Sequence, residues 1–314
     1  MAPEYQTSER RVPWPDGIQC PVVLNFHPDG EALAIALDAE NARRPCTQTM
    51  YTYGPRVGMQ RILRLLRKYD LKGSFYCTAL TAERHPYMIE WIVAGGHEVG
   101  CHGWTHDWPN WLSPEVEEEH LDKQLESLTR LAGKRQRGYI SPGWEYSEQT
   151  LALLRARGFE FSGDWLGEDI PYYVEVDGEQ TEFVAVPVNW TLDDAPLYWF
   201  SLFPPLSYGA PYAEPSRVFE LWTSEFDALY EEGAVYHLTM HPFLSGRGCR
   251  VKTLERLIQY ILQRPGVKFC TMEEVAEMYK QVVTPEQGRP GAWFPAKGDP
   301  APRINQIEGI PIFT

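Results

Sequence analysis

The sequence lacks three features that would assign it to a special class of protein. None of its 314 residues belongs to an apolar run of about 18, so no membrane-spanning helix is expected. Lys and Arg number 29 against 43 Asp and Glu, and the net charge of −14 argues against nucleic-acid or anionic-membrane partners. Residues Met1 to Gly17 lack the apolar core of a signal peptide. We therefore expect a cytoplasmic protein.

Cysteine is scarce, and its spacing shows no pairing. The six cysteines include no C-x-x-C pair, and several lie in apolar runs: Cys20, Cys46, Cys77, Cys101, Cys249 and Cys270. In a cytosolic chain of this size, this favours buried free thiols over disulfides. Cys101 is adjacent to His102 and could donate a thiolate to a metal. We favour a core position for Cys101, because side chains alternate along a strand and its neighbour would face the other way.

The remaining composition is that of an ordinary globular protein, with 43% hydrophobic and 23% charged residues and no internal repeat. Strand-like apolar runs alternate with segments that have helical periodicity. The expected strands are 20–26, 73–77, 97–102, 137–140, 159–163, 182–190, 234–240 and 267–270. The expected helices are 58–69, 113–131, 147–157, 216–232, 250–264 and 272–283. This alternation predicts one α/β domain with a parallel sheet, most economically a barrel or a distorted one.

Domain boundaries follow from the composition. We expect an N-terminal arm over 1–17, one barrel domain over 18–284, and a Pro/Gly-rich tail over 285–314 that forms no packed element of its own. Two segments interrupt the alternation. Glu31 to Pro55 is predicted to be a long connection, and the aromatic-rich segment from Asp193 to Pro215 is predicted to be an active-site loop or a subunit contact.

Histidines gather at the predicted strand ends, where a barrel collects its chemistry. His102 and His106 are four residues apart and follow a strand-like run. The first strand is followed by His27 and Asp29, which share one face if the chain is extended. Asp29 with His102 and His106 would give three protein ligands and leave positions open for water and substrate, as a catalytic divalent metal requires. His241 closes a later strand.

Several motifs resemble the polysaccharide deacetylase (carbohydrate esterase family 4) superfamily, in particular its branch of intracellular peptidoglycan-deacetylase-like proteins, cyclic imidases and ureide-type allantoinases. The likeness covers most of the chain. It depends on Phe26-His27-Pro28-Asp29-Gly30-Glu31, Tyr53-Gly54-Pro55-Arg56-Val57-Gly58, Gly96-His97-Glu98-Val99-Gly100-Cys101-His102-Gly103-Trp104-Thr105-His106, Ser141-Pro142-Gly143-Trp144, Trp190-Thr191-Leu192-Asp193-Asp194 and Leu238-Thr239-Met240-His241-Pro242.

This resemblance implies a distorted (β/α)7 barrel of the NodB homology type and a divalent metal on Asp29, His102 and His106. It also implies hydrolysis of a C–N bond by metal-activated water, with His241 as the general acid. We expect zinc, with Fe, Co, Mn and Ni as alternatives. A homo-oligomer, either a dimer or a tetramer, is also expected. The family places a residue that orients the acid after the fifth strand, and Asp164 is our choice for that role.

The sequence departs from the family at two positions. The family's base is the first Asp of F-D-x-D, and an Arg in an R-A-P-W-like motif pairs with it; in this chain the two positions hold His27 and Ile140. Removing one partner of a buried ion pair costs about 3–5 kcal/mol, whereas replacing both by neutral groups leaves no charge unpaired. His27 can act as a general base near neutral pH, bind the metal as an extra ligand, or only shape the substrate site.

The predicted function is metal-dependent hydrolysis of an amide-type C–N bond in a small molecule, such as an acetamide, imide or ureide. Expected substrate-binding residues are Arg56, which could clamp a carboxylate or imide oxygen, Trp144 and Trp190, which could wall an apolar pocket, and Asp194. One alternative is a non-hydrolytic, lyase-type metal enzyme that uses His27 for proton transfer. Another is a catalytically silent binding protein of the same fold.

Overall fold

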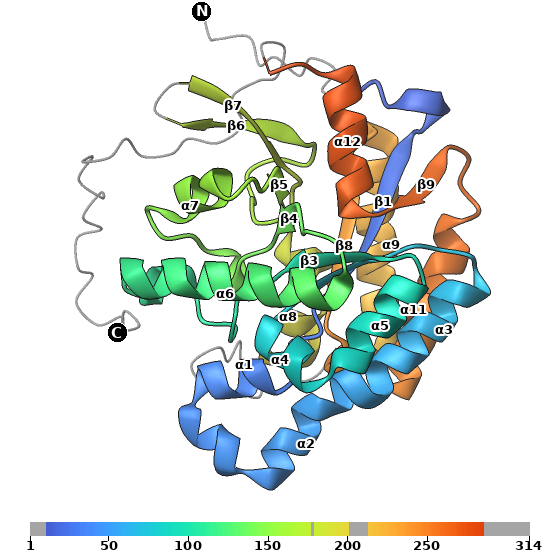
Figure 1. The fold of residues 1–314 in the computed structure, drawn as a ribbon. Coiled ribbons are helices and arrows are strands. Elements are labelled where there is room, and N and C mark those ends of the chain that lie inside the picture. Colours follow the sequence, from blue (N-terminus) through green and yellow to red (C-terminus); the bar gives the residue numbers. More distant parts are fainter. Residues whose placement is uncertain (1–10, 177–178, 201–212, 286–314) are drawn as a thin grey trace, which may run out of the picture.

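The computed structural model describes residues 11–176, 179–200 and 213–285. Its strands form one sheet in the order β6-β7-β5-β4-β3-β2-β1-β8, with β9 beside β1 (Figure 1). The parallel strands are β1 (Cys20–Phe26), β2 (Ser74–Cys77), β3 (Glu98–Cys101), β4 (Gly138–Tyr139), β5 (Phe161–Ser162), β7 (Glu179–Ala185) and β8 (Tyr236–Met240). Strand β6 (Tyr172–Val176) is antiparallel to β7, and β9 (Val267–Cys270) is parallel to β1.

A single contact closes the sheet into a barrel. Strand β8 pairs with one edge of β1 from Val22 to Phe26. Strands β2 and β9 therefore pair with the other edge of β1. The segment after β7 then reaches β8 through an isolated parallel bridge between Asp193 and Thr239. The parallel strands therefore form the predicted distorted (β/α)7 barrel, whose last seam is irregular because one bridge replaces a continuous ladder.

Helices surround this barrel. They are α1 (Gly30–Leu37), α2 (Pro45–Tyr53), α3 (Met59–Lys68), α4 (Ala79–Arg84), α5 (Pro86–Ala94), α6 (Pro114–Ala132), α7 (Thr150–Ala156), α8 (Asp194–Tyr198), α9 (Pro215–Glu232), α10 (Pro242–Ser245), α11 (Gly248–Ile261) and α12 (Met272–Val282). Figure 1 shows α12 near the start of β1, and α1 and α2 at the opposite end, where β1 stops. Within the described ranges, no helix is long and apolar enough to cross a membrane.

Two groups of buried side chains make up the core. The larger group fills the space between the sheet and the outer helices and includes Cys77 and Cys101. The smaller group includes Val23, Tyr76 and Ile140, and α12 contributes Met272 to it. This division follows the two faces of each strand, and it assigns Cys101 to the apolar group outside the barrel, as alternation predicts. All six cysteines are free, with Cys46 and Cys249 exposed and the other four buried.

The structure corrects the predicted organisation at two places. The expected long connection from Glu31 to Pro55 is largely helical, because α1, α2 and a 3₁₀ turn over Ala39–Arg43 occupy it. Strand β6 is absent from the strands that the sequence predicts. The described part of the expected N-terminal arm, residues 11–17, is anchored to the barrel, since Trp14 is buried and donates from Nε1 to the Gly233 carbonyl at 2.9 Å. The predicted tail from residue 286 onward, and residues 201–212 of the predicted aromatic-rich loop, lie outside the described residues.

Candidate metal site

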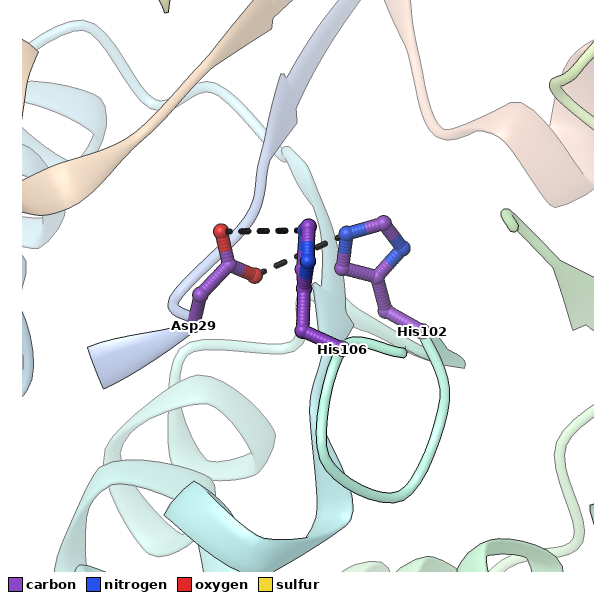
Figure 2. A group of neighbouring side chains, drawn as sticks. All are labelled: Asp29, His102 and His106. Carbon is purple, nitrogen blue, oxygen red and sulfur yellow. Dashed lines mark ion pairs between the residues drawn. The ribbon is translucent and has the colours of Figure 1, made fainter. Parts of the chain in front are cut away.

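Asp29, His102 and His106 meet at the end of the barrel where the parallel strands stop. Asp29 is the N-cap of α1, directly after β1 and His27-Pro28, and His102 directly follows β3. Their ligand atoms, with that of His106, all lie within 4.8 Å of one another. His102 Nε2 is 3.6 Å from Asp29 Oδ1, and His106 Nε2 is 3.8 Å from Asp29 Oδ2. Figure 2 shows the two imidazoles on the same side of the carboxylate.

The atoms of this cluster that could bind a metal carry lone pairs, and several of them receive no hydrogen bond. Within the described chain, neither carboxylate oxygen of Asp29 nor His102 Nε2 has a hydrogen-bond partner, although all are buried. The Nδ1 of His102 lies 2.8 Å from the carbonyl oxygen of Ile140 and donates to it, so its Nε2 carries a lone pair. An unpaired buried carboxylate is costly. A divalent cation would remove that cost, and one oxygen with two imidazole nitrogens is a donor set that suits Zn²⁺ and similar metals.

The pKa shifts in the cluster agree with this interpretation. Burial raises the pKa of Asp29 to about 7 and lowers the pKa of His102 to about 3. Burial also lowers the pKa of His106 well below its usual value. In each case the charged form is disfavoured because the site excludes water. The histidines are therefore neutral near pH 7, which is the state in which imidazole binds a metal.

Asp193, Asp194 and His241 form a second compact group, but their polar atoms already have partners. Asp194 accepts hydrogen bonds from the backbone N–H of His241 at 3.1 Å, from His241 Nδ1 at 2.6 Å and from the Ser245 hydroxyl. Asp193 accepts from the backbone N–H of Ala195 at 2.6 Å. With its acceptors satisfied, this group fits a support for His241 better than a second metal site.

His241 directs its Nε2 toward the cluster of Asp29, His102 and His106. Its Nε2 is 3.7 Å from Oδ2 of Asp29, while Asp194 holds Nδ1. Burial alone would lower the pKa of His241, but the charges of Asp193 and Asp194 raise it to about 10. His241 is therefore protonated near neutral pH and has a proton to give beside the predicted metal ligands.

Asp164 does not make the contact predicted for it. Its Oδ1 accepts from the backbone N–H of Ser141 at 2.6 Å, and its Oδ2 accepts from the Tyr146 hydroxyl at 2.8 Å. The contact that orients His241 comes instead from Asp194, which the sequence predicts to bind substrate. The sequence feature that could have indicated this role is the Asp193-Asp194 pair. In the structure, the bridge between Asp193 and Thr239 joins this pair to the strand that ends before His241.

His27 lies against the cluster of Asp29, His102 and His106 without belonging to it. Its ring centroid is 4.2 Å from that of His102 and 5.4 Å from that of His241. Its Nε2 is 3.1 Å from Nδ2 of Asn25. Burial lowers the pKa of His27 well below its usual value, and the nearby imidazoles of His102 and His241 lower it further. His27 is therefore neutral near pH 7. The other altered position, Ile140, contributes its carbonyl oxygen to His102.

Aromatic side chains lie on the loops after the strands. Trp144 is buried and packs against Trp190 with ring centroids 4.3 Å apart, whereas Trp190 keeps 38% of its surface exposed. A second pair, Trp108 and Trp111, stacks at 4.5 Å on the loop that follows His106, and no motif in the sequence singles it out. The structure thus brings Trp144 and Trp190 together, and their contact with substrate stays a prediction.

Arg56 is exposed in a π-helical turn, Gly54–Gly58, between α2 and α3. This turn packs against the segment after His241: a Cβ on Gly58 would stand 2.0 Å from the Pro242 carbonyl oxygen. Among the described residues, Arg56 forms no ion pair with an acid. Its predicted role as a substrate clamp stays a prediction.

Comparison with known proteins agrees with the fold. The family model described as "Polysaccharide deacetylase" matches residues 40–162. A peptidoglycan deacetylase of Helicobacter pylori is 33% identical over 245 residues, which cover 70% of this chain and 83% of that protein. The chain belongs to the polysaccharide deacetylase family. It is accordingly a hydrolase of the class that acts on amide-type C–N bonds.

Two solved structures share the fold over most of this chain. A Mycobacterium smegmatis protein assigned to the polysaccharide deacetylases superposes with a TM-score of 0.83 at 32% identity, covering 91% of this chain and 98% of its own. PuuE allantoinase superposes with a TM-score of 0.73 at 22% identity and covers 88% of this chain and 96% of its own. At that identity the allantoinase shows the shared fold alone.

Proposed function

We propose that this deacetylase-family protein hydrolyses an amide-type C–N bond of a small molecule and uses a divalent cation held by Asp29, His102 and His106. One observation carries the proposal: three buried donor atoms, both oxygens of Asp29 and Nε2 of His102, converge without any hydrogen-bond donor. Such an arrangement is costly unless a cation is bound. Zinc suits the ligand set, and Fe, Co, Mn or Ni are alternatives.

If bound by Asp29, His102 and His106, a divalent cation would polarise a carbonyl group and lower the pKa of a bound water to about 7. The chain itself supplies the proton transfer. The imidazolium of His241 donates from Nδ1 to Asp194, which holds the ring in place, and directs its second N–H, on Nε2, toward the cluster. A protonated His241 can therefore protonate the departing nitrogen, whose release as an anion would otherwise limit the reaction.

For the substrate we favour a small amide, imide or ureide. Trp144 and Trp190 form an aromatic pair after the barrel strands, and the side of Trp190 that remains exposed is available to an apolar ligand. Arg56 could bind an anionic or carbonyl group at the edge of the site. A cytoplasmic location, which would separate the protein from the cell wall, is part of this proposal. A homo-oligomer stays our expectation.

Metal analysis and a substrate panel test the proposal together. Purified protein is dialysed against chelator, reloaded with Zn²⁺, and assayed with acetamides, cyclic imides and ureides, with Asp29→Asn as the comparison. We expect about one metal ion per chain for the wild type, a large loss of metal for the variant, and turnover of at least one compound class. Protein that cannot be loaded with any divalent metal would contradict the metal site, and loaded protein that hydrolyses none of the panel would contradict the substrate class.

A further inference from the structure

The side chain of Asn25 contacts His27 directly. Asn25 lies on β1, two residues before His27, and both side chains are buried. Its Nδ2 is 3.1 Å from Nε2 of His27. The amide NH₂ can only donate a hydrogen bond, so the ring nitrogen that it meets must accept one. Nε2 of His27 therefore carries the lone pair, and the proton of the neutral imidazole is on Nδ1.

The position of the ring determines what this tautomer can do. The backbone N–H of His27 donates to the Met240 carbonyl at 2.8 Å, which extends the β1–β8 pairing to His27 and fixes its backbone. The ring then lies beside His102 and His241. Within the described residues, Nδ1 has no hydrogen-bond partner. A general base or a metal ligand needs a free lone pair, and the only lone pair of this ring is already engaged by Asn25.

We propose that His27 donates a hydrogen bond from Nδ1 to an oxygen atom of the bound substrate and serves neither as the general base nor as a metal ligand. This inference rests on the proposed hydrolysis. It leaves His241 as the group that protonates the departing nitrogen and makes Asn25 a positioning residue. It also implies that the substrate atom facing Nδ1 of His27 is a carbonyl oxygen, which can accept a hydrogen bond from Nδ1–H, rather than an N–H group.

The surroundings of His27 support a neutral donor. A carboxylate at this position would need a cationic partner in the barrel interior, whereas a neutral imidazole needs none. Ile140, directly after β4, is fully buried and offers no charge. Neither His27 nor Ile140 carries a charge near pH 7. This is consistent with a His27 imidazole that stays neutral while it binds an uncharged oxygen atom.

Nuclear magnetic resonance tests the tautomer without any assay. In zinc-loaded protein labelled with ¹⁵N, correlations between the ring protons and ring nitrogens of His27 report which nitrogen is protonated. We expect the proton on Nδ1 in the wild type. In Asn25→Asp the side chain can only accept, so we expect the proton to move to Nε2. A wild-type proton on Nε2 would overturn the inference, whatever the variant shows.

Kinetics and zinc content then separate the three roles of His27. His27→Asn keeps an N–H group close to the position of Nδ1, whereas His27→Ala removes it. We expect His27→Ala to lose about tenfold or more in kcat/KM, as for loss of a hydrogen bond to a reacting oxygen, and His27→Asn to recover part of that loss. Both variants should bind zinc as the wild type does.

Other outcomes overturn the inference. A general base predicts equal losses of about 10²–10⁴-fold in both variants, and a metal ligand predicts loss of zinc from both. Failure of the parent proposal is recognised separately, because wild-type protein that binds zinc but hydrolyses none of the panel contradicts the hydrolysis. A proton on Nε2 contradicts only the role of His27 as a hydrogen-bond donor to substrate.

Discussion

Nδ1 of His241 lies 2.6 Å from Oδ1 of Asp194, although the two residues are 47 positions apart in the chain. Asp194 also accepts the backbone N–H of His241 and the hydroxyl of Ser245, so the carboxylate fixes the ring and both ends of α10. The arrangement resembles that of other imidazole acid–base groups, which need a third residue to set their tautomer.

Asp194→Asn tests this relationship. The variant keeps an oxygen that can accept from Nδ1 but removes a charge that raises the pKa of His241. We expect the pKa of His241, followed by NMR, to fall, and kcat for the best substrate of the panel to drop by roughly 10²-fold or more. Zinc content should not change, because Asp194 is not among the proposed ligands. Loss of metal together with activity would instead place Asp194 in the metal site.

Metal binding should stabilise the folded protein. A ligand that binds only the native state at 100 times its Kd adds about 2.7 kcal/mol to the free energy of unfolding. We therefore expect Zn²⁺ to raise the Tm of chelator-treated wild type and His120→Ala, and to leave Asp29→Asn and His102→Ala nearly unchanged. His120 serves as the control because it lies on α6 and outside the cluster. A similar shift in all four proteins would indicate adventitious binding.

His97 should make stability depend on pH. Burial lowers the pKa of His97 to about 4, and the charges of Lys72 and Arg67 contribute to that shift. The unfolded chain, with a histidine pKa near 6.5, then binds more protons than the folded one between the two values. The free energy of unfolding should therefore decrease as the pH falls from about 6.5 toward 4.

The comparison for His97 is His97→Asn, which keeps an acceptor for the Gly73 N–H that now donates to His97 Nδ1 at 3.2 Å. Denaturant unfolding at pH 7 and pH 5 should show a smaller loss of stability in the variant than in the wild type. Equal losses in the two proteins would show that other groups account for the acid sensitivity.

Gly58 should tolerate no side chain. A Cβ there would lie 2.0 Å from the Pro242 carbonyl oxygen, although the backbone of Gly58 is helical and unstrained. We expect Gly58→Ala to cost about 1–3 kcal/mol in unfolding free energy, as overpacking does. Gly248→Ala is the matched control, because Gly248 begins α11 and a Cβ there would meet its nearest neighbour, Nη1 of Arg61, at 3.9 Å. Chemical denaturation of both variants measures the difference, and equal stabilities would contradict the predicted clash.

The alternation of strands and helices was readable because most strands of the barrel lie in apolar runs flanked by polar turns. β1 and β9 have the bounds expected from the sequence, Cys20–Phe26 and Val267–Cys270. Strand β6 was missed because it is a short segment of five residues, although its aromatic and β-branched residues are typical of a strand. The helices between Glu31 and Pro55 escaped prediction for a similar reason: they are short, and α2 buries only Tyr51.

The sequence by itself determined the repeating α/β pattern and the pairing of Asp29 with His102 and His106, because the spacing of ligands after strands is local and the carboxyl ends of parallel strands meet at one edge. Only the tertiary structure decided which carboxylate supports His241. Asp164 and Asp194 both follow strand-like segments, and the bridge between Asp193 and Thr239 that closes the barrel brings Asp194 rather than Asp164 to the imidazole. Likewise, only the fold placed the amide of Asn25 against His27, because a hydrogen bond between buried side chains depends on rotamers that the whole barrel interior fixes.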